Sequence, residues 1–264
     1  MSGNDAAEQL RSLRREPPPF RRVSVRSTEM LSERMKRIVL GGSELDGFAI
    51  ESAASSVRLL LPPAGHDRLV MPTWTGNQFD LPDGSRAPIR TFTPRHFDAG
   101  ELELTLDMVL HDGGAAADWA RGAQPGDEVA ISGPGRSEQL DDAARSFLLA
   151  GDESAIPAIA QLLEWIDADR AIDVHVEVTG PGGRLDLPEH PNTVVTWHEQ
   201  QPDAAPGDAM VAAVMDVTEL ADAVWVAGEA ASVQRLRKYL FDERGRDRSS
   251  VTARGYWKTG RSAT

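Results

Sequence analysis

The hexapeptide Arg90–Arg95 (RTFTPR) brings together an arginine, an aromatic ring and two hydroxyl groups. We predict a β-strand here, whose two-residue period would place Arg90 and Phe92 on one face and Thr91 and Thr93 on the other. An arginine beside an aromatic ring can hold a phosphate group while the ring stacks on a flat ligand. The alternative is an ordinary strand with one arginine that reaches solvent.

The segment His111–Trp119 (HDGGAAADW) is rich in small residues and directly follows a predicted strand. Small residues that open a helix leave backbone N–H groups exposed, and such groups suit a pyrophosphate. Trp119 would then anchor the helix in the core. Taken alone, a plain strand–turn–helix connection explains the same pattern, and His111 is then a structural hydrogen-bonding residue.

Two strand-to-helix corners occur in the second half of the chain, at Gly151–Pro157 and at Val226–Ala230. Ligands of open α/β sheets bind at the carboxyl ends of the strands, so these corners are candidate nucleotide sites. Alternatively, Gly228 only permits close packing of strand and helix. The sequence lacks both G-x-G-x-x-G and the P-loop lysine motif, which argues against a Rossmann dehydrogenase and a P-loop NTPase.

The C-terminal run Arg254–Arg261 (RGYWKTGR) mixes aromatic rings with cations. Such a run can cover a cofactor ring or attract an anion. A terminal strand that ends in a solvated basic tail is the competing interpretation.

The elements that must position these residues change in type along the chain. Short strand-like runs at 22–26, 35–40, 57–61, 89–93, 101–110 and 128–132 predict a small antiparallel barrel or sandwich. From residue 145 strand and helix patterns alternate, which predicts a parallel α/β sheet. We therefore expect a mobile tail at 1–19, a β-barrel domain at 20–141 and an α/β domain at 145–264.

Composition excludes several classes of protein. The 264-residue chain has 41 acidic and 28 basic residues and a formal charge of −13, which disfavours nucleic acid and anionic membranes as partners. It has no cysteine, so disulfides, thiolate metal sites and protein-bound iron–sulfur clusters are excluded. We see no secretory signal, apolar span, metal-ligand spacing or G-x-S-x-G motif, and expect a cytoplasmic protein without membrane insertion or a resident metal.

The order of these motifs resembles the siderophore-interacting proteins, which are FAD-dependent ferric-siderophore reductases of the ferredoxin–NADP reductase-like superfamily. The resemblance extends from about Phe20 to Gly260 and implies a flavin-binding antiparallel barrel followed by an α/β domain that binds NADPH or NADH. Phe92 stands where the family has tyrosine and Ala117 where it has serine, so we expect weaker FAD binding than is typical.

The resemblance also implies roles for particular residues. For FAD they are Arg90, Thr91, Phe92, Thr93, Asp107, Val109, His111, Ala115, Ala116 and Ala117. For NAD(P)H they are Asp152, Glu153, Ser154, Ala155, Gly228 and Glu229. For a flavin cover or a basic siderophore mouth they are Arg254, Trp257, Lys258 and Arg261.

The implied reaction passes a hydride from NAD(P)H to FAD and then single electrons to Fe(III), which releases Fe(II) from the siderophore. The flavin carries the redox chemistry, so no catalytic side chain is assigned. Because the chain is acidic, an anionic ferric siderophore requires a local basic mouth. We expect a monomer. Two alternatives remain: a related flavoenzyme with another electron acceptor, such as free flavin or a carrier protein, and a non-catalytic flavin- or siderophore-binding protein.

Overall fold

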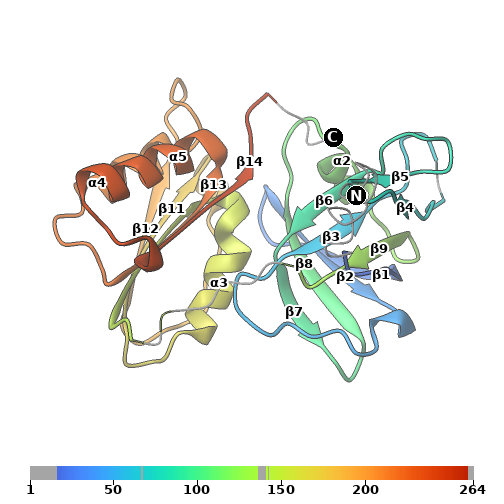
Figure 1. The fold of residues 1–264 in the computed structure, drawn as a ribbon, viewed down its shortest axis with the longest axis horizontal. Helices are drawn as coiled ribbons and strands as arrows, with labels where there is room; N and C mark the ends of the chain where they lie inside the picture. The colour runs from blue at the N-terminus through green and yellow to red at the C-terminus, as the bar shows by residue number, and fades with distance from the viewer. Residues whose placement is uncertain (1–16, 67, 136–140, 142, 261–264) are drawn as a thin grey trace, which may run out of the picture.

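The computed structural model describes residues 17–260 except 67, 136–140 and 142, and it contains two domains (Figure 1). Most of the expected mobile tail at 1–19 lies outside the described residues. Within it, the carbonyl oxygen of Pro18 accepts a hydrogen bond from the hydroxyl of Ser132 at 2.5 Å. The last barrel strand ends at Ser132 and the first α/β strand begins at Ser146, so the expected boundary at 141–145 lies between them.

The first domain is a curled antiparallel sheet, as the strand patterns predict, and its strand order is β6-β3-β9-β1-β2-β8-β7. A small hairpin and one helix complete the domain. The bounds are β1 Phe20–Met30, β2 Met35–Gly41, η1 Ser43–Leu45, β3 Val57–Leu60, β4 Thr73–Trp74, β5 Phe79–Asp80, β6 Ile89–Phe92, β7 Pro94–Asp98, β8 Glu103–Val109, α2 Ala115–Gly122 and β9 Glu128–Ser132.

Alternation along the strands fills the barrel. In β8, Leu104 and Leu106 are fully buried and lie in the same apolar cluster as Ile38 and Leu40 of β2. Adjacent residues such as Thr105 are only half-buried. A strand with one face in the core needs this two-residue pattern, which is why β8 could be predicted as a strand from its sequence.

The expectation that Arg90–Arg95 forms one strand is wrong. β6 ends at Phe92 and pairs with β3, whereas β7 begins at Pro94 and pairs with β8. These two strands are the opposite ends of the sheet, so the chain crosses between them at Thr93. Proline has no N–H to donate and interrupts regular pairing. The predicted shared face therefore fails: Thr91 is exposed and Thr93 is buried.

The second domain is a parallel sheet with the order β12-β11-β10-β13-β14, as the alternation of strands and helices predicts. The bounds are β10 Ser146–Asp152, η2 Glu153–Ala155, α3 Ile156–Trp165, β11 Ala171–Val178, η3 Pro181–Gly183, β12 Thr193–Glu199, α4 Asp208–Asp216, β13 Ala223–Glu229, α5 Ala230–Lys238, η4 Tyr239–Glu243, η5 Arg248–Ser250 and β14 Val251–Trp257.

Both faces of this sheet are covered, because its strands are apolar on both sides. Phe147 and Leu149 of β10 pack with α3 on one face, and Leu148 and Ala150 pack with α4 and α5 on the other. Helix α3 lies between the sheet and the barrel (Figure 1). The arrangement brings the carboxyl ends of β10, β13 and β14 together at one edge of the domain.

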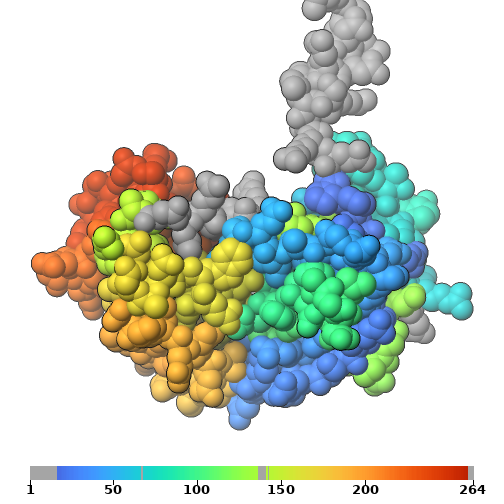
Figure 2. All heavy atoms as spheres, turned by 90° about the horizontal axis from the view of Figure 1, so that it is seen from below, coloured from blue at the N-terminus to red at the C-terminus, as the bar shows by residue number. Residues whose placement is uncertain are grey.

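The two domains meet along a continuous contact in which the blue and green barrel abuts the yellow and orange part of the α/β domain (Figure 2). At its centre the buried Gln161 of α3 accepts a hydrogen bond from the N–H of Ala54 (2.9 Å) and donates one to the carbonyl of Pro94 (2.6 Å). Arg95 forms a two-pronged ion pair with Glu164 nearby. One helix of the second domain is thus fixed by backbone groups of the first.

Candidate functional site

Arg90 carries an unneutralised charge at the edge of the barrel. It lies opposite Leu59 in the β3–β6 pair, and its guanidinium donates to the carbonyl of Ile89 at 2.9 Å. Among the described residues, no carboxylate forms an ion pair with it. Burial lowers the pKa of Arg90, and the nearby charge of Arg86 lowers it further. An arginine without a carboxylate partner favours an anionic ligand.

Arg86 is a residue that sequence reasoning missed. It precedes Arg90 by four residues in a segment without clear periodicity, it forms an isolated bridge with Asp80, and its charge lowers the pKa of Arg90. Phe92 follows Arg90 on the same face and packs against the barrel core. Its ring therefore has a fixed orientation from which it can contact a flat ligand.

The N-terminus of α2 is a second candidate anion-binding site. Gly113 and Gly114 have φ values of +75° and +114°, a backbone conformation that glycine adopts readily. Gly114 offers no side-chain cap, and within the described chain the backbone N–H groups of Ala115, Ala116 and Ala117 have no acceptor. Free N–H groups at a helix start attract phosphate oxygens.

The three alanines differ in what they can offer. Ala117 is 1% exposed, Ala116 is half-buried and Ala115 is exposed. A ligand at this helix end would therefore meet Ala115 and Ala116 more readily than Ala117. The exposed ring of His111 lies over the same turn, since a Cβ on Gly114 would come within 3.0 Å of its Cε1.

Lys36, which belongs to none of the predicted site segments, holds the other end of α2. The residue is 8% exposed, and its ammonium group donates to the carbonyls of Arg121 (3.2 Å) and Ala123 (3.3 Å). A cation at a helix C-terminus satisfies free carbonyls and complements the helix dipole. The strand pattern around Lys36 carried no signal for this contact, because Arg121 and Ala123 are distant in sequence.

Strand β8, which contacts α2, has an open edge. Its partner β7 begins at Pro94, which pairs with Leu106, so within the part of the chain that the structure describes the stretch Asp107–Val109 has no strand on that side. The carboxylate of Asp107 is bound by Arg37 at 2.7 and 2.8 Å, and this contact raises the pKa of Arg37. What Asp107 and Val109 leave open to a flat ligand is therefore backbone.

These features fit FAD, which joins a flat ring to a diphosphate. Arg90 and the α2 N-terminus supply two separate sets of donors for phosphate oxygens. Phe92 and the open edge of β8 supply a surface for a ring. The predicted FAD residues from the three segments belong to one domain, and among the described residues no carboxylate neutralises Arg90 and no side chain caps α2.

Asp152 occupies the centre of the α/β edge and is 7% exposed. Its carboxylate accepts from the N–H (2.9 Å) and hydroxyl (2.5 Å) of Ser154, the N–H of Glu229 (2.8 Å) and the indole N–H of Trp257 (2.8 Å). Burial raises the pKa of Asp152, and these donors oppose that effect. A Cβ on Gly228 would lie 2.5 Å from this carboxylate, so the glycine is needed for close packing.

Two further carboxylates accept backbone N–H groups at helix N-termini of this domain. Glu229, 3% exposed, accepts from the N–H groups of Ala231 (2.6 Å) and Ser232 (3.1 Å) at the start of α5. Burial raises its pKa, but the backbone donors outweigh burial and leave the pKa of Glu229 lowered. Glu177, which sequence reasoning missed, accepts from Gly207 (2.6 Å) and Met210 (2.9 Å) at the start of α4. Burial raises the pKa of Glu177.

The other predicted nucleotide residues are also engaged within the protein. Glu153 is bound by Arg34 of the barrel, the hydroxyl of Ser154 donates to Asp152, and Ala155 is fully buried. The side chains of the first corner thus build the corner itself. A nucleotide at this edge would meet exposed groups around it.

The C-terminal strand supplies such groups. Trp257 is 41% exposed although its indole N–H is held by Asp152, and Lys258 is exposed with no ion pair among the described residues. The backbone N–H of Thr259 donates to Glu229 at 3.1 Å, which ties the strand end to the second corner. Arg254 is half-buried and has a partner of its own. Arg261 lies outside the described residues.

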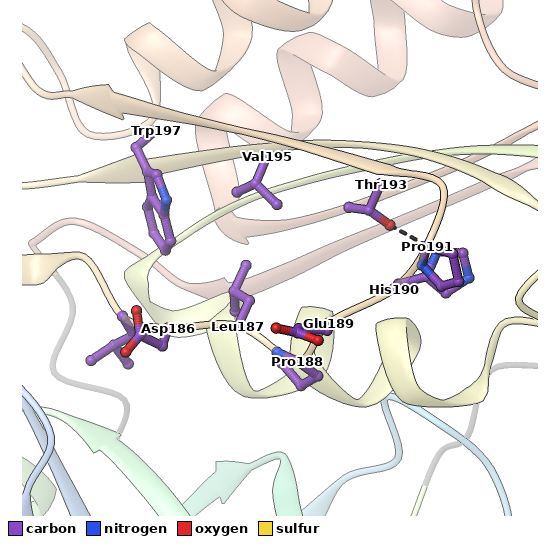
Figure 3. A pocket seen from close by; sticks show the side chains of 10 residues that line it. Asp186, Leu187, Pro188, Glu189, His190, Pro191, Thr193, Val195 and Trp197 are labelled. Carbon is purple, nitrogen blue, oxygen red and sulfur yellow. Dashed lines mark hydrogen bonds between the residues drawn. The ribbon is translucent and has the colours of Figure 1, made fainter.

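A surface hollow lies at the opposite edge of the parallel sheet. It is formed by β12 and the segment that runs below it, and Val195 and Trp197 point toward Leu187 across it (Figure 3). β12 and β14 are the two ends of the sheet. None of the predicted site residues lines this hollow.

A flavin-compatible antiparallel barrel followed by a parallel α/β sheet defines the ferredoxin–NADP reductase-like class. A cytochrome P450 reductase from Amycolatopsis shares this fold with a TM-score of 0.64, at 22% identity over 92% of this chain and 72% of that chain. A siderophore utilization protein from T. fusca is closer, with a TM-score of 0.83 and 30% identity over 94% of this chain and 96% of that chain.

The sequence comparisons narrow the class to a family. Residues 24–138 match the siderophore-interacting FAD-binding domain, and residues 144–260 match the siderophore-interacting protein model. The chain belongs to the siderophore-interacting protein family.

Two named relatives span most of the chain. The NADPH-dependent ferric-chelate reductase of Escherichia coli is 32% identical over 90% of this chain and 92% of that protein. The ferric vibriobactin reductase of Vibrio cholerae is 31% identical over 88% of this chain and 87% of that protein.

Proposed function

We propose that this protein is an FAD-dependent NAD(P)H:ferric-siderophore reductase. One NAD(P)H would supply two electrons, two ferric chelates would each accept one, and NAD(P)⁺ and one proton would be released. FAD supplies the conversion between hydride transfer and single-electron transfer when it is bound. The observation that carries the proposal is that the barrel has two groups of donors suited to an anion, the guanidinium of Arg90 and the uncapped start of α2.

The residues of the barrel would hold and orient the cofactor. Arg90 and the N–H groups of Ala115–Ala117 would bind the diphosphate, and Phe92 would contact the ring system. Asp107 and His111 lie at the open end of β8, where backbone groups can bind ring heteroatoms. Thr91 is exposed, whereas Thr93 is buried between β6 and β7. We therefore assign a hydroxyl contact with FAD to Thr93.

The residues of the α/β edge would receive the nucleotide. Asp152, Ser154 and Glu229 hold the corner in shape, and Gly228 leaves room for it. Because these carboxylates are satisfied within the protein, we propose that they hold the corner in shape and do not themselves bind the nucleotide. The name of one relative supports NADPH as the donor, which remains our proposal for this chain.

Iron enters as part of the substrate. Oxygen-donor siderophores favour the harder Fe(III), so reduction to Fe(II) weakens the chelate and releases the metal. With a formal charge of −13, the protein repels anionic chelates unless a local basic mouth receives them. We propose Lys258, Arg254 and Arg261 for this mouth and Trp257 for a cover above the ring.

We further propose that the protein acts as a monomer in the cytoplasm. Both cofactor surfaces belong to a single chain, and the polar contacts of Gln161 already join its domains. NAD(P)H is supplied inside the cell, and the cysteine-free sequence has no need of an oxidising compartment. No helix in the described ranges is long and apolar enough to cross a membrane.

An absorption experiment tests the function. A bound oxidised flavin gives a band at about 450 nm, which should bleach with anaerobic NADPH or NADH and return when a ferric siderophore is added. Bleaching without recovery by ferric chelates, but with recovery by free flavin or a carrier protein, would identify a different flavoenzyme. No flavin after incubation with excess FAD would leave a non-catalytic binding protein.

A further inference from the structure

We propose that Arg34 is a positioning residue that aligns the flavin surface of the barrel with the nucleotide corner of the α/β domain. This inference rests on the proposed function. Arg34 belongs to none of the predicted site segments, and its role follows from two contacts that it makes in different domains. Its backbone binds the end of β8, and its side chain binds Glu153.

The backbone contact fixes Arg34 to the flavin side. Its carbonyl accepts the N–H of Leu110 at 2.7 Å, directly after the open edge Asp107–Val109. The turn that carries Arg34 is itself held, because the hydroxyl of Ser32 accepts from the N–H groups of Arg34 (3.2 Å) and Met35 (3.1 Å). Any shift of this turn therefore moves the strand end beside the flavin surface.

The side-chain contact reaches the other domain. The Nε–H of Arg34 lies 2.9 Å from each carboxylate oxygen of Glu153, whose side chain is 9% exposed. Glu153 follows Asp152 at the carboxyl end of β10, and it also accepts the N–H of Thr179 after β11 at 3.0 Å. A Cβ on Gly183 would lie 2.5 Å from the same carboxylate, so this position of Glu153 requires glycine at residue 183.

The path Leu110–Arg34–Glu153–Thr179 thus connects one strand end of the barrel with two strand ends of the α/β sheet. The packing follows the same division, since Val109 packs against the α/β core and Leu110 against the barrel core. Hydride transfer requires donor and acceptor atoms about 3–3.5 Å apart, and a misplacement of about 1 Å can slow a reaction about 100-fold. With the two substrates on different domains, the contact that sets the relative position of these strand ends sets the rate.

The pair Arg95–Glu164 provides a matched control. It is also an arginine–glutamate ion pair between the domains, in which Nη1 and Nη2 of Arg95 each bind one carboxylate oxygen, at 2.8 and 2.6 Å. It joins β7 to the last turn of α3 and does not include Leu110, Glu153 or Thr179. Glu164→Gln removes an interdomain ion pair of the same type without entering the Arg34 path.

The test compares Arg34→Met with Glu164→Gln in the FAD-loaded protein. Arg34→Met keeps the apolar stem and removes the donor. We expect the limiting rate of flavin reduction by saturating NADPH to fall about 10- to 100-fold, with the Kd of NADPH and of FAD within about twofold of wild type. Reoxidation of the dithionite-reduced protein by a ferric siderophore should keep its rate. Glu164→Gln should reduce and reoxidise as wild type does, and Arg34→Lys should recover part of the loss.

A readout independent of turnover uses the protein without FAD. In Arg34→Met the Glu153 carboxylate loses its fixed partner, so the Thr179 amide should exchange with deuterium at least about threefold faster. Glu164→Gln should leave that exchange unchanged. The double variant Arg34→Met with Glu153→Gln should be no slower in flavin reduction than the slower single variant, because both act on one contact.

Three results would overturn the inference. One is a wild-type reduction rate in Arg34→Met, and another is a loss of rate that merely parallels a loss of FAD. The third is an increased Kd for NADPH with additive effects in the double variant, which would mean that Arg34 itself binds the nucleotide. If the wild type is reduced by neither nucleotide, the proposed function fails, and Thr179 exchange still decides whether Arg34 fixes Glu153. Should Arg34→Met not fold, Glu153→Gln is the variant measured, with the same expectation for the rate of flavin reduction.

Discussion

The candidate ligand-binding end of the barrel and the candidate ligand-binding edge of the α/β sheet differ in whether the protein itself uses their hydrogen-bond donors. On the barrel, Arg90 has no carboxylate partner among the described residues and the start of α2 has no side-chain cap. On the sheet, Asp152, Glu177 and Glu229 occupy the donors at the turn before α3 and at the starts of α4 and α5. One surface keeps its anion donors free, and the other uses them internally.

We interpret this difference through residence time. A cofactor that stays bound benefits from preorganised donors whose binding energy is not spent on internal contacts. A nucleotide that must leave after each turnover is better served by a rigid, self-satisfied edge with a few exposed cations around it. If this interpretation holds, the internal carboxylates contribute to stability and Arg90 contributes to binding.

The largest effect is expected from Asp152→Asn. The amide would turn an N–H₂ group toward donors that now face a carboxylate, so the free energy of unfolding should fall by about 3 kcal/mol. Ser154→Ala removes one of the donors and should lower it by only about 1 kcal/mol. Urea unfolding measures both. Equal effects of the two variants would contradict a central role for the carboxylate.

Arg90→Ala should act on binding rather than on folding. Loss of a charge-assisted phosphate contact should raise the Kd for FAD about 30-fold, equivalent to about 2 kcal/mol. Arg58 on neighbouring β3 is exposed and supplies the control for net charge. A fluorescence titration of FAD in which Arg58→Ala and Arg90→Ala weaken binding equally would remove the specific role of Arg90.

Glu229→Gln should cost about 1 kcal/mol of stability near neutral pH, because a weaker acceptor remains at the start of α5. The pKa of Glu229 is lowered from its ordinary value of 4.5. The stabilisation from the ionised form is therefore complete above that value and is lost as pH falls through the lower folded-state pKa. The difference between wild type and variant should shrink on acidification in this range, as chemical unfolding at several pH values can show.

His198→Gln should give the smallest effect. Burial lowers the pKa of His198 from 6.5 and the adjacent His175, 3.0 Å away, lowers it further, while Asp173 opposes the shift. A lowered histidine pKa stabilises the fold above the unfolded value, and this contribution is lost as pH falls below it. Between about pH 7.5 and about pH 5.5 the variant should lose a few tenths of a kcal/mol less stability than wild type. An equal loss in both proteins would exclude this histidine as the cause.

The comparison also bears on which residues of the candidate site a sequence can suggest. The motifs at Arg90, Ala115–Ala117 and Asp152 carry recognisable residue types at short spacing, so their positions were open to prediction. Arg34 and Lys36 carry no such signal, because their partners Glu153 and Arg121 are far away in the chain. The strand at Pro94–Asp98 was also missed, since only its pairing with β8 separates it from β6.

The sequence by itself determined the two-domain order, the antiparallel and parallel sheets and the family motifs. These features depend on local periodicity and turn residues, which each segment expresses without its neighbours. Tertiary structure alone decided that the carboxylates of Asp152 and Glu229 are consumed internally while Arg90 stays free. Whether a charged group is neutralised depends on what folding brings within hydrogen-bond distance, and no local pattern encodes that partner.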